Sequence, residues 1–462
     1  MRLLLKMFLV LGMTIAIMIP LMMIRGTIGE RQTYRAQAVD SIARSYAGAQ
    51  AFAGPVLVVP YIETVEVEEK DDKGKVIRKV KVDGASGRWT FFPDRLDIDG
   101  KLTPATRRLG LHEVRVYELQ ALATANFTVR IPADANPGLP RKIGQPWLSY
   151  GVADVRGLIG TPRLGIDGRD VALEEGFGSR EGGGVHVRLA KPLAGQDLRL
   201  STRLGFTLGG TESLALVPLA KNSVFKVNSP WPHPRFGGSF LPRSRDVAAQ
   251  GFRAQWEISS LATNAQAQFL AGKTLPSVGT TSRYQNDEAA AIETGGIDAV
   301  GVSLVDPVNV YSQADRASKY GLLFVLLTFV GFFMFELIKQ LPIHPVQYGL
   351  VGLSLAIFFL LLVSLSEHIR FGLAYLAASV ACIGLLGFYL SAVLRSVGRG
   401  LGFAAMLAML YAALYGLLVS EDNALVLGSG LLFVILATLM VVTRKVDWYQ
   451  LGGARIPPVP TS

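Results

Sequence analysis

The chain has 462 residues, of which 50% are hydrophobic and only 18% are charged, and its mean hydropathy is +0.35. This composition excludes an ordinary soluble globular protein, because soluble chains carry more charge and fewer apolar residues. The net charge of +10 is spread along the chain without dense Lys and Arg clusters, so nucleic-acid binding is not expected.

Residues 1–24 predict a transmembrane anchor. Arg2 and Lys6 are followed by eighteen uncharged residues, Met7 to Ile24. At about 1.5 Å per residue this stretch can cross a hydrocarbon core of roughly 30 Å with some thinning of the bilayer. The bulky residues that follow offer no small-residue cleavage site, so we expect the anchor to be retained.

Residues 25–319 predict a large, mainly antiparallel β region with enough sequence for two β subdomains. We expect a juxtamembrane helix over about 30–52 and a second helical stretch near 261–271. The segments PVLVVPYIETVEVE and KVIRKVKVDG predict a hairpin in which acidic residues of one strand face basic residues of the other. Further hairpin turns are predicted at three Asp-Gly pairs: Asp83-Gly84, Asp99-Gly100 and Asp167-Gly168.

Residues 320–443 predict a bundle of five more transmembrane helices, which makes six in total. The expected spans are Tyr320–Ile338, Gly349–Ser366, Phe371–Leu394, Leu401–Val419 and Ala424–Val442. Basic residues concentrate in one set of connecting loops, and such loops lie on the cytoplasmic side. Both termini are therefore expected in the cytoplasm, with 444–462 as a cytoplasmic tail, and 25–319 is expected in the periplasm of a bacterium.

The sequence contains no recognisable motif for catalysis, a metal or a cofactor. The five histidines lack paired ligand spacing, and Cys382, the single cysteine, supplies neither a zinc site nor an internal disulfide. A phosphate-binding loop and a nucleophile elbow are also absent from the sequence. We therefore expect no cofactor, no metal and no enzymatic activity.

Two groups of residues are candidates for function. In SPWPHPRFGGSFLP, alternate prolines favour a stiff extended segment, which either joins two β units or presents Trp231, His233 and Arg235 to a periplasmic partner. The second group contains ionisable residues in or beside the spans, where burial is costly: Glu336, Lys339, His344, Glu367 and His368. Glu336 is expected to pair with Lys339 on one helical face. A proton relay is disfavoured, because the predicted topology puts His344 and His368 on opposite membrane faces.

Several segments resemble the CreD family of bacterial inner-membrane proteins. They are GVADVRG, NSPWPHPRFGGSFLP, YSQADRASKYGLL, IHPVQYGLVGLSLAIFFLLLVSLSEH and VDWY, and they extend over nearly the whole chain. The resemblance implies one N-terminal span, a large periplasmic region and a C-terminal bundle. It also implies membership of a regulon under the CreBC two-component system, with links to envelope integrity, colicin tolerance and the β-lactam response. No catalytic or ligand residue is carried over from the family.

Three classes of function remain open at the level of sequence. The favoured one is a non-enzymatic inner-membrane protein that supports envelope integrity and the envelope-stress or β-lactam response, and whose periplasmic β region binds an unidentified envelope component. The first alternative is a transporter or lipid-handling protein, motivated by six spans with polar groups at their ends. The second is a membrane enzyme acting on cell-wall or lipid substrates, which requires two carboxylates, or a carboxylate and His233, in one pocket. The lipid bilayer is the other expected partner.

Overall fold

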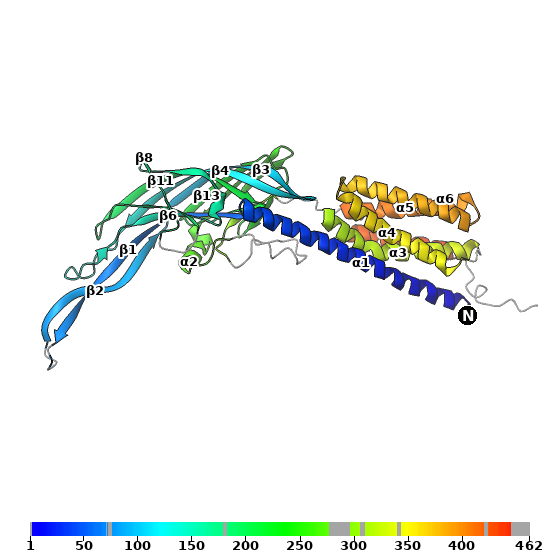
Figure 1. The fold of residues 1–462 in the computed structure, drawn as a ribbon, viewed down its shortest axis with the longest axis horizontal. Coiled ribbons are helices and arrows are strands. Elements are labelled where there is room, and N and C mark those ends of the chain that lie inside the picture. The colour runs from blue at the N-terminus through cyan, green and yellow to red at the C-terminus, as the bar shows by residue number, and fades with distance from the viewer. Residues whose placement is uncertain are drawn as a thin grey trace, which may run out of the picture. The chain divides into compact units, whose positions relative to one another are not determined.

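The computed structural model describes residues 2–70, 72, 76–178, 183–276, 296–304, 310–339, 343–419 and 424–444 (Figure 1). The chain divides into two compact units. We call Met1–Tyr34 together with Val308–Ser462 the helical unit, and Arg35–Pro307 the β unit.

The N-terminal anchor and the juxtamembrane helix form one continuous helix, α1 (Arg2–Ser45). The helix ends at Ser45, before the expected end near residue 52, so the expectation for the last residues is wrong. The physical reason is sheet pairing, because Gln50–Phe52 lie at the start of strand β1 and pair in parallel with Leu214–Leu216.

The helical unit confirms the six apolar helices. Besides α1 they are α3 (Val310–Lys339), α4 (Pro345–Ser366), α5 (Phe371–Val393), α6 (Val397–Val419) and α7 (Ala424–Thr443). Five helices, α1 and α3 to α6, are long and apolar enough within the described residues to cross a membrane, and α7 adds a shorter apolar stretch, Val426–Thr438. Aromatic residues such as Phe332, Phe358 and Tyr411 fill the bundle interior, while Leu376 and Val380 are exposed on its outside, as suits contact with lipid.

The β unit contains two sheets of mostly antiparallel strands, as predicted. Over the described residues, sheet A has nine strands: β14 (Arg235–Gly238), β17 (Val300–Ser303), β12 (Ser213–Leu216), β1 (Gln50–Lys70), β6 (Trp147–Val152), β10 (Gly184–Arg188) and β9 (Glu174–Glu175) in order, with β2 (Val76–Phe91) and β5 (Lys142–Ile143) also paired to β1. Sheet B has eight in the same part of the chain: β15 (Ser244–Ala248), β16 (Gly251–Ser259), β13 (Asn222–Ser229), β3 (Arg95–Leu109), β4 (His112–Arg130), β11 (Asp197–Thr211), β7 (Leu158–Ile166) and β8 (Arg169–Val171). The parallel pairings are β1 with β12 and β13 with β3.

The two sheets share one hydrophobic core. Phe52 of sheet A stacks on Phe206 of sheet B, with ring centroids 4.7 Å apart. The expected two β subdomains are thus two sheets within one compact unit. A smaller core lies on the other face of sheet A, where Phe269 of the short helix α2 (Ala265–Leu270) packs near Val56 and Val58. This helix confirms the stretch expected near 261–271.

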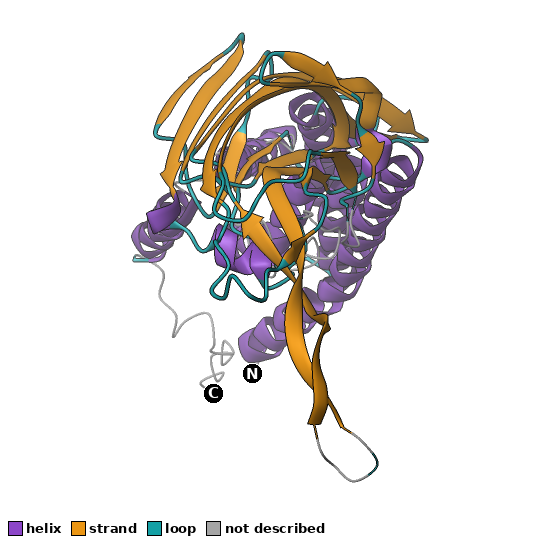
Figure 2. Cartoon of the chain, turned by 90° about the vertical axis from the view of Figure 1, so that its left-hand side faces the viewer, coloured by secondary structure: helices purple, strands orange, loops and turns teal. Residues whose placement is uncertain are grey.

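The charged hairpin is the long ribbon formed by β1 and β2 (Figure 2). Glu66 pairs directly with Lys81, and Glu68 with Lys79, so acidic and basic residues face each other as predicted. Lys79 Nζ also lies 3.3 Å from a Glu66 oxygen. Exposed pairs of this kind each stabilise a protein by less than about 1 kcal/mol. The hairpin charges therefore set the strand register more than they add stability.

Candidate functional site

An open groove lies on the face of sheet A that points away from sheet B. In β1, Leu57 and Val59 belong to the core shared with sheet B, whereas Val56 and Val58 belong to the core under α2. Because strand residues alternate between faces, Pro60 continues the α2-covered face. Residues paired directly across strands share a face, and on this basis the following lie with Pro60: Ile62, Ser86, Arg88, Lys142 and Trp147.

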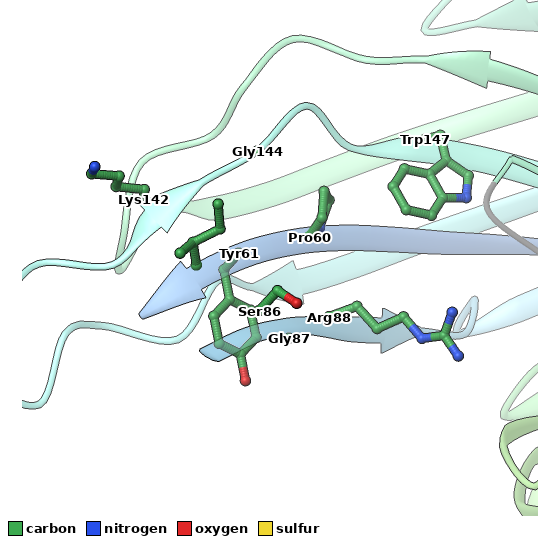
Figure 3. A pocket seen from close by; sticks show the side chains of 9 residues that line it. Pro60, Tyr61, Ser86, Gly87, Arg88, Lys142, Gly144 and Trp147 are labelled. Atoms are coloured by element: carbon green, nitrogen blue, oxygen red, sulfur yellow. The ribbon is translucent and has the colours of Figure 1, made fainter. Parts of the chain in front are cut away.

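The groove begins where the cover provided by α2 ends. Trp147 packs against the core under α2 and also lines the groove, so it marks the border between them. Figure 3 shows Trp147 at one end of the groove and Lys142 at the other. The space has a volume of about 420 Å³, which lies in the range of small-ligand sites. Its lining consists of Pro60, Tyr61, Ile62, Ser86, Gly87, Arg88, Lys142, Gly144 and Trp147.

The charge of the groove is positive. Lys142 Nζ forms an ion pair with Asp83. The exposed Arg88 guanidinium has no carboxylate partner among the described residues. A guanidinium presents several donors in a planar fork that fits a carboxylate or a phosphate. The groove therefore combines an apolar floor, formed by Pro60 and Trp147, with a cation available to an anionic ligand.

Aromatic side chains pack on the opposite face of the strands that form the floor of the groove. Tyr61 and Trp89 stack with ring centroids 4.2 Å apart, and the Arg141 guanidinium lies 5.6 Å from the Tyr61 centroid. The Tyr61 ring also covers Gly87, where any Cβ would lie closer than 3.0 Å to the ring. Only glycine at position 87 allows this packing, so the strand geometry under the groove depends on it.

The lining of the groove suits binding rather than catalysis. Among the described lining residues there is no aspartate, glutamate or histidine, so they supply no pair of groups for acid–base chemistry. The described part of the chain also contains no cluster of three His, Cys, Asp or Glu that could hold a metal ion.

The structure places Trp231 in the core of the β unit. The side chain is 9% exposed and packs between the two sheets. Its indole Nε1 donates to the carbonyl oxygen of His233 at 2.8 Å, and the Arg115 guanidinium lies 4.7 Å from its ring centroid. The side chains of His233 and Arg235 are exposed. Arg235 begins β14 at the edge of sheet A, and its presentation with His233 to a partner stays a prediction.

Glu336 and His344 make local contacts at the ends of α3 and α4. The buried Glu336 carboxylate accepts a hydrogen bond from the Tyr348 hydroxyl at 2.9 Å. The Lys339 side chain lies outside the described residues, so its pairing with Glu336 stays a prediction. His344 caps α4, because its Nδ1 accepts from the Val346 N–H at 3.3 Å. Such a cap satisfies a backbone donor that the helix itself leaves unpaired.

Glu367 and His368 lie after the other end of α4. Glu367 is nearly buried and forms an ion pair with Arg31 of α1, whose Nε is 3.3 Å from the carboxylate. His368 is exposed, and its Nδ1 lies 3.2 Å from the Ser364 carbonyl oxygen. The two histidines beside α4 are thus at opposite ends of this 22-residue helix, and the structure does not bring them together.

Comparison with known proteins decides the family. The family model described as "Inner membrane protein CreD" matches residues 2–449. The chain belongs to the CreD family. The inner membrane protein CreD of Escherichia coli K12 is 35% identical over 449 residues, which cover 96% of this chain and 93% of the relative. The resemblance expected from the sequence segments is therefore confirmed.

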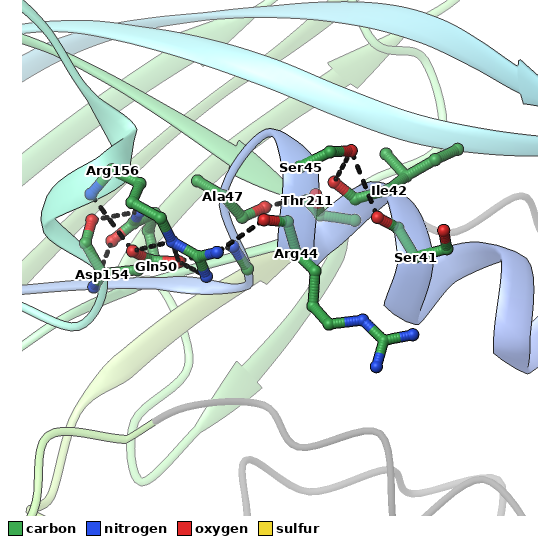
Figure 4. Close-up of polar contacts among 10 residues, drawn as sticks. Ser41, Ile42, Arg44, Ser45, Ala47, Gln50, Asp154, Arg156 and Thr211 are labelled. Atoms are coloured by element: carbon green, nitrogen blue, oxygen red, sulfur yellow. Dashed lines mark hydrogen bonds and ion pairs between the residues drawn. The ribbon is translucent and has the colours of Figure 1, made fainter.

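One of the CreD-like segments, GVADVRG, forms a polar junction at the start of β1 (Figure 4). Asp154 accepts hydrogen bonds from the Gly48 N–H at 3.1 Å and from Arg156 Nη2 at 2.6 Å. Arg156 Nη1 donates to the carbonyl oxygen of Arg44 in the last turn of α1. Gln50 completes the junction with hydrogen bonds to the backbone of Asp154 at 2.9 and 3.2 Å. These contacts hold the end of α1 against the sheets of the β unit.

Replacing Asp154 by asparagine is expected to lower the stability of the β unit by about 1–3 kcal/mol at neutral pH. Hydrogen bonds from Arg156 hold the pKa of the Asp154 carboxyl below its usual value of 3.8. The ionised carboxylate therefore stabilises the fold above pH 4 or so, and this stabilisation is lost as the pH falls through the lower pKa of the folded state. Thermal unfolding between pH 3 and 7 checks this.

The matched control for Asp154 is Asp97→Asn. Asp97 pairs with Arg95 on the exposed surface, where ion pairs have little effect. If Asp154→Asn lowers stability by the same amount at pH 3 and at pH 7, or no more than Asp97→Asn does, the carboxylate does not stabilise the junction in the way described.

Sequence reasoning did not identify the groove. Arg88, Lys142 and Trp147 lie on three different strands, and the pairing of β5 and β6 with β1 leaves no short-range signal. The alternation in PVLVVPYIETVEVE predicts that Pro60 and Ile62 share a face with Val58. That signal was present, but it does not show where α2 stops covering this face.

Proposed function

We propose that this CreD-family protein is a non-enzymatic inner-membrane protein that supports envelope integrity, and that its β unit binds an envelope component in the periplasm. The observation that carries the proposal is the groove beside α2, whose lining combines the exposed Arg88 with the apolar Pro60 and Trp147. The ligand that fits has an apolar surface and an anionic group. Its binding links the protein to the envelope-stress or β-lactam response.

The distribution of charge supports a periplasmic β unit. Lys339, Arg395, Arg399 and Arg444 lie in or beside one set of helix connections, which the positive-inside rule assigns to the cytoplasm. The connection between α4 and α5, on the other side, contains Arg370 as its single Lys or Arg. With six spans, both termini then lie in the cytoplasm and the segment between α1 and α3 lies in the periplasm.

Replacing Arg88 by alanine is expected to weaken ligand binding at least about tenfold, because a hydrogen bond to a charged group contributes about 1.5–3 kcal/mol. A photo-crosslinking residue in place of Ile62, which lines the groove, measures the effect in living cells. We expect an adduct with one defined envelope component, and we expect Arg88→Ala to reduce its yield and to abolish rescue of β-lactam tolerance in cells that lack the native chain.

Arg78→Ala is the matched control, because Arg78 is also exposed on β2 but pairs with Glu69 in the ribbon. Protease added outside spheroplasts checks that the β unit of each variant is folded and faces the periplasm. Equal adduct yields from the Arg78 and Arg88 variants, or no adduct under envelope stress, would contradict binding in the groove. Protection of the β unit from external protease would contradict the periplasmic location.

A further inference from the structure

Hydroxyl side chains in the helical unit mostly bond to the backbone of their own helix. Thr328 Oγ1 donates to the Phe324 carbonyl oxygen at 2.9 Å, and Ser366 Oγ donates to that of Val363 at 2.8 Å. Ser391, Ser429 and Thr438 make the same kind of bond. This arrangement satisfies a hydroxyl in an apolar bundle without any other partner.

Three hydroxyls inside the bundle depart from this pattern. Ser354 of α4 is 7% exposed, Ser379 of α5 is 6% exposed and Tyr411 of α6 is 2% exposed. Their oxygen atoms form no hydrogen bond of ordinary geometry among the described residues, although the Tyr375 hydroxyl lies beside Ser379 and the Cys382 thiol lies beside Tyr411. An unsatisfied hydroxyl is costly in the apolar interior of a membrane bundle, where lipid offers no hydrogen bond. These three groups therefore have hydrogen-bonding capacity that the protein around them does not fully use.

The three hydroxyls lie around one polar seam between α4, α5 and α6. The Cys382 thiol of α5 donates to the Ser354 carbonyl oxygen at 3.7 Å, which joins α5 to α4. The Tyr375 hydroxyl donates to the Tyr411 carbonyl oxygen at 2.8 Å, which joins α5 to α6. Tyr375, Ser379 and Cys382 follow at spacings of four and three residues, so they share one face of α5.

Only a small, uncharged molecule suits the seam as a hydrogen-bonding partner. The sequences of α4 and α5 contain no Asp, Glu, Lys or Arg, and α6 contains only Arg399, in its first turn and far along the helix from Tyr411. An ion in the seam therefore has no countercharge nearby, and its desolvation cost excludes it. Aromatic rings enclose the seam, with the Phe358 centroid 4.6 Å from that of Tyr411. Water fits these limits, because it is small and both donates and accepts, and buried water commonly makes about three hydrogen bonds.

We propose that α4, α5 and α6 bind water in this seam, with the hydroxyls of Ser354, Ser379 and Tyr411 as its hydrogen-bonding partners. Ser354 and Ser379 lie near the middle of α4 and α5, so the water is held deep in the membrane. Hydroxyl side chains at this depth commonly form hydrogen bonds that join neighbouring helices. The helical bundle then binds water in addition to anchoring the protein in the membrane. This binding does not depend on the ligand proposed for the β unit.

Cys382 provides a direct test, because it is the only cysteine and its thiol lies in the seam. The S–H stretch in the infrared is separate from other protein bands, and it moves when the thiol exchanges its hydrogen for deuterium. We expect the thiol of the full chain in lipid vesicles to exchange in D₂O, and the double variant Ser354→Ala, Tyr411→Phe to exchange at least about tenfold more slowly. An S–H band that persists in the native chain, or equal rates in both proteins, overturns the proposal.

Thermal unfolding of single and double variants provides a second measurement. The direction in which the unfolding midpoint changes distinguishes a seam that holds water from a dry seam. If the hydroxyls bind water together, Ser379→Ala and Tyr411→Phe each lower the midpoint of thermal unfolding, and the double variant loses less than the sum. If they are unsatisfied in a dry seam, each substitution raises the midpoint, because it removes a costly group, and the proposal fails. Ser366→Ala is the control, since that hydroxyl bonds within its own helix.

Discussion

Replacing Trp231 by alanine is expected to destabilise the β unit by about 3–5 kcal/mol. The side chain fills the core between the two sheets, and its loss leaves a cavity there. The substitution also removes the hydrogen bond from the indole to the His233 carbonyl oxygen and the contact with Arg115. Urea unfolding of the full chain in detergent, followed by the resistance of the β unit to trypsin, measures the effect.

Exposed neighbours of Trp231 provide the controls. His233→Ala and Arg235→Ala remove exposed side chains that each make a local contact, so each should lower stability by no more than about 1 kcal/mol. Trp231→Phe keeps part of the buried volume and should fall between the native chain and Trp231→Ala. A Trp231→Ala variant with native stability but without envelope function would assign Trp231 to a partner surface instead of the core.

The same variants test whether the proline-rich segment SPWPHPRFGGSFLP joins parts of the β unit or presents side chains to a partner. Burial of Trp231 supports the interpretation that the segment joins parts of the β unit, because the ring packs with residues of both sheets. The exposure of His233 and Arg235 leaves them accessible to a partner. Loss of envelope function in these two variants at native stability is the result that favours the second interpretation.

The Asp-Gly pairs mark the limit of turn prediction from the sequence. Asp167-Gly168 forms the predicted turn between β7 and β8, with φ values of 50° and 80°. Asp83-Gly84 and Asp99-Gly100 lie inside strands β2 and β3, so these two predictions are wrong. At Gly84 and Gly100 a Cβ would approach Val65 and Leu119 side chains closer than 3.0 Å. Close packing across strands therefore explains these glycines, and it has no local signature.

Local patterns predicted the elements of this protein better than their arrangement. Apolar runs of about 20 residues identified the six helices, because crossing a membrane requires that length. Alternation and charge identified the hairpin of β1 and β2. The parallel pairing of β1 with β12 joins Gln50 to Leu214, and such distant contacts are invisible to periodicity. The groove depends on pairings of this kind, so its residues could be assembled only from the structure.

Replacing Gly157 by alanine is expected to destabilise the junction at the start of β1 by about 2–4 kcal/mol. A Cβ at this position would lie closer than 3.0 Å to Gln50 Nε2 and to the Gly209 carbonyl oxygen. The backbone of β11 cannot move away easily, because Gly209 is paired within sheet B. Gln50 must then move, and its two hydrogen bonds with Asp154 are lost inside the protein.

Gly205→Ala is the matched control for Gly157→Ala. Gly205 lies in the same strand as Gly209, and a Cβ there would meet no atom within 4 Å. We expect this variant to be as stable as the native chain or slightly more stable, because alanine restricts the unfolded chain. The thermal unfolding midpoint and the membrane level of each variant measure the difference. If the two variants behave alike, the close approach of Gly157 to Gln50 does not limit the stability of the β unit, and the junction at Asp154 tolerates displacement of its partner.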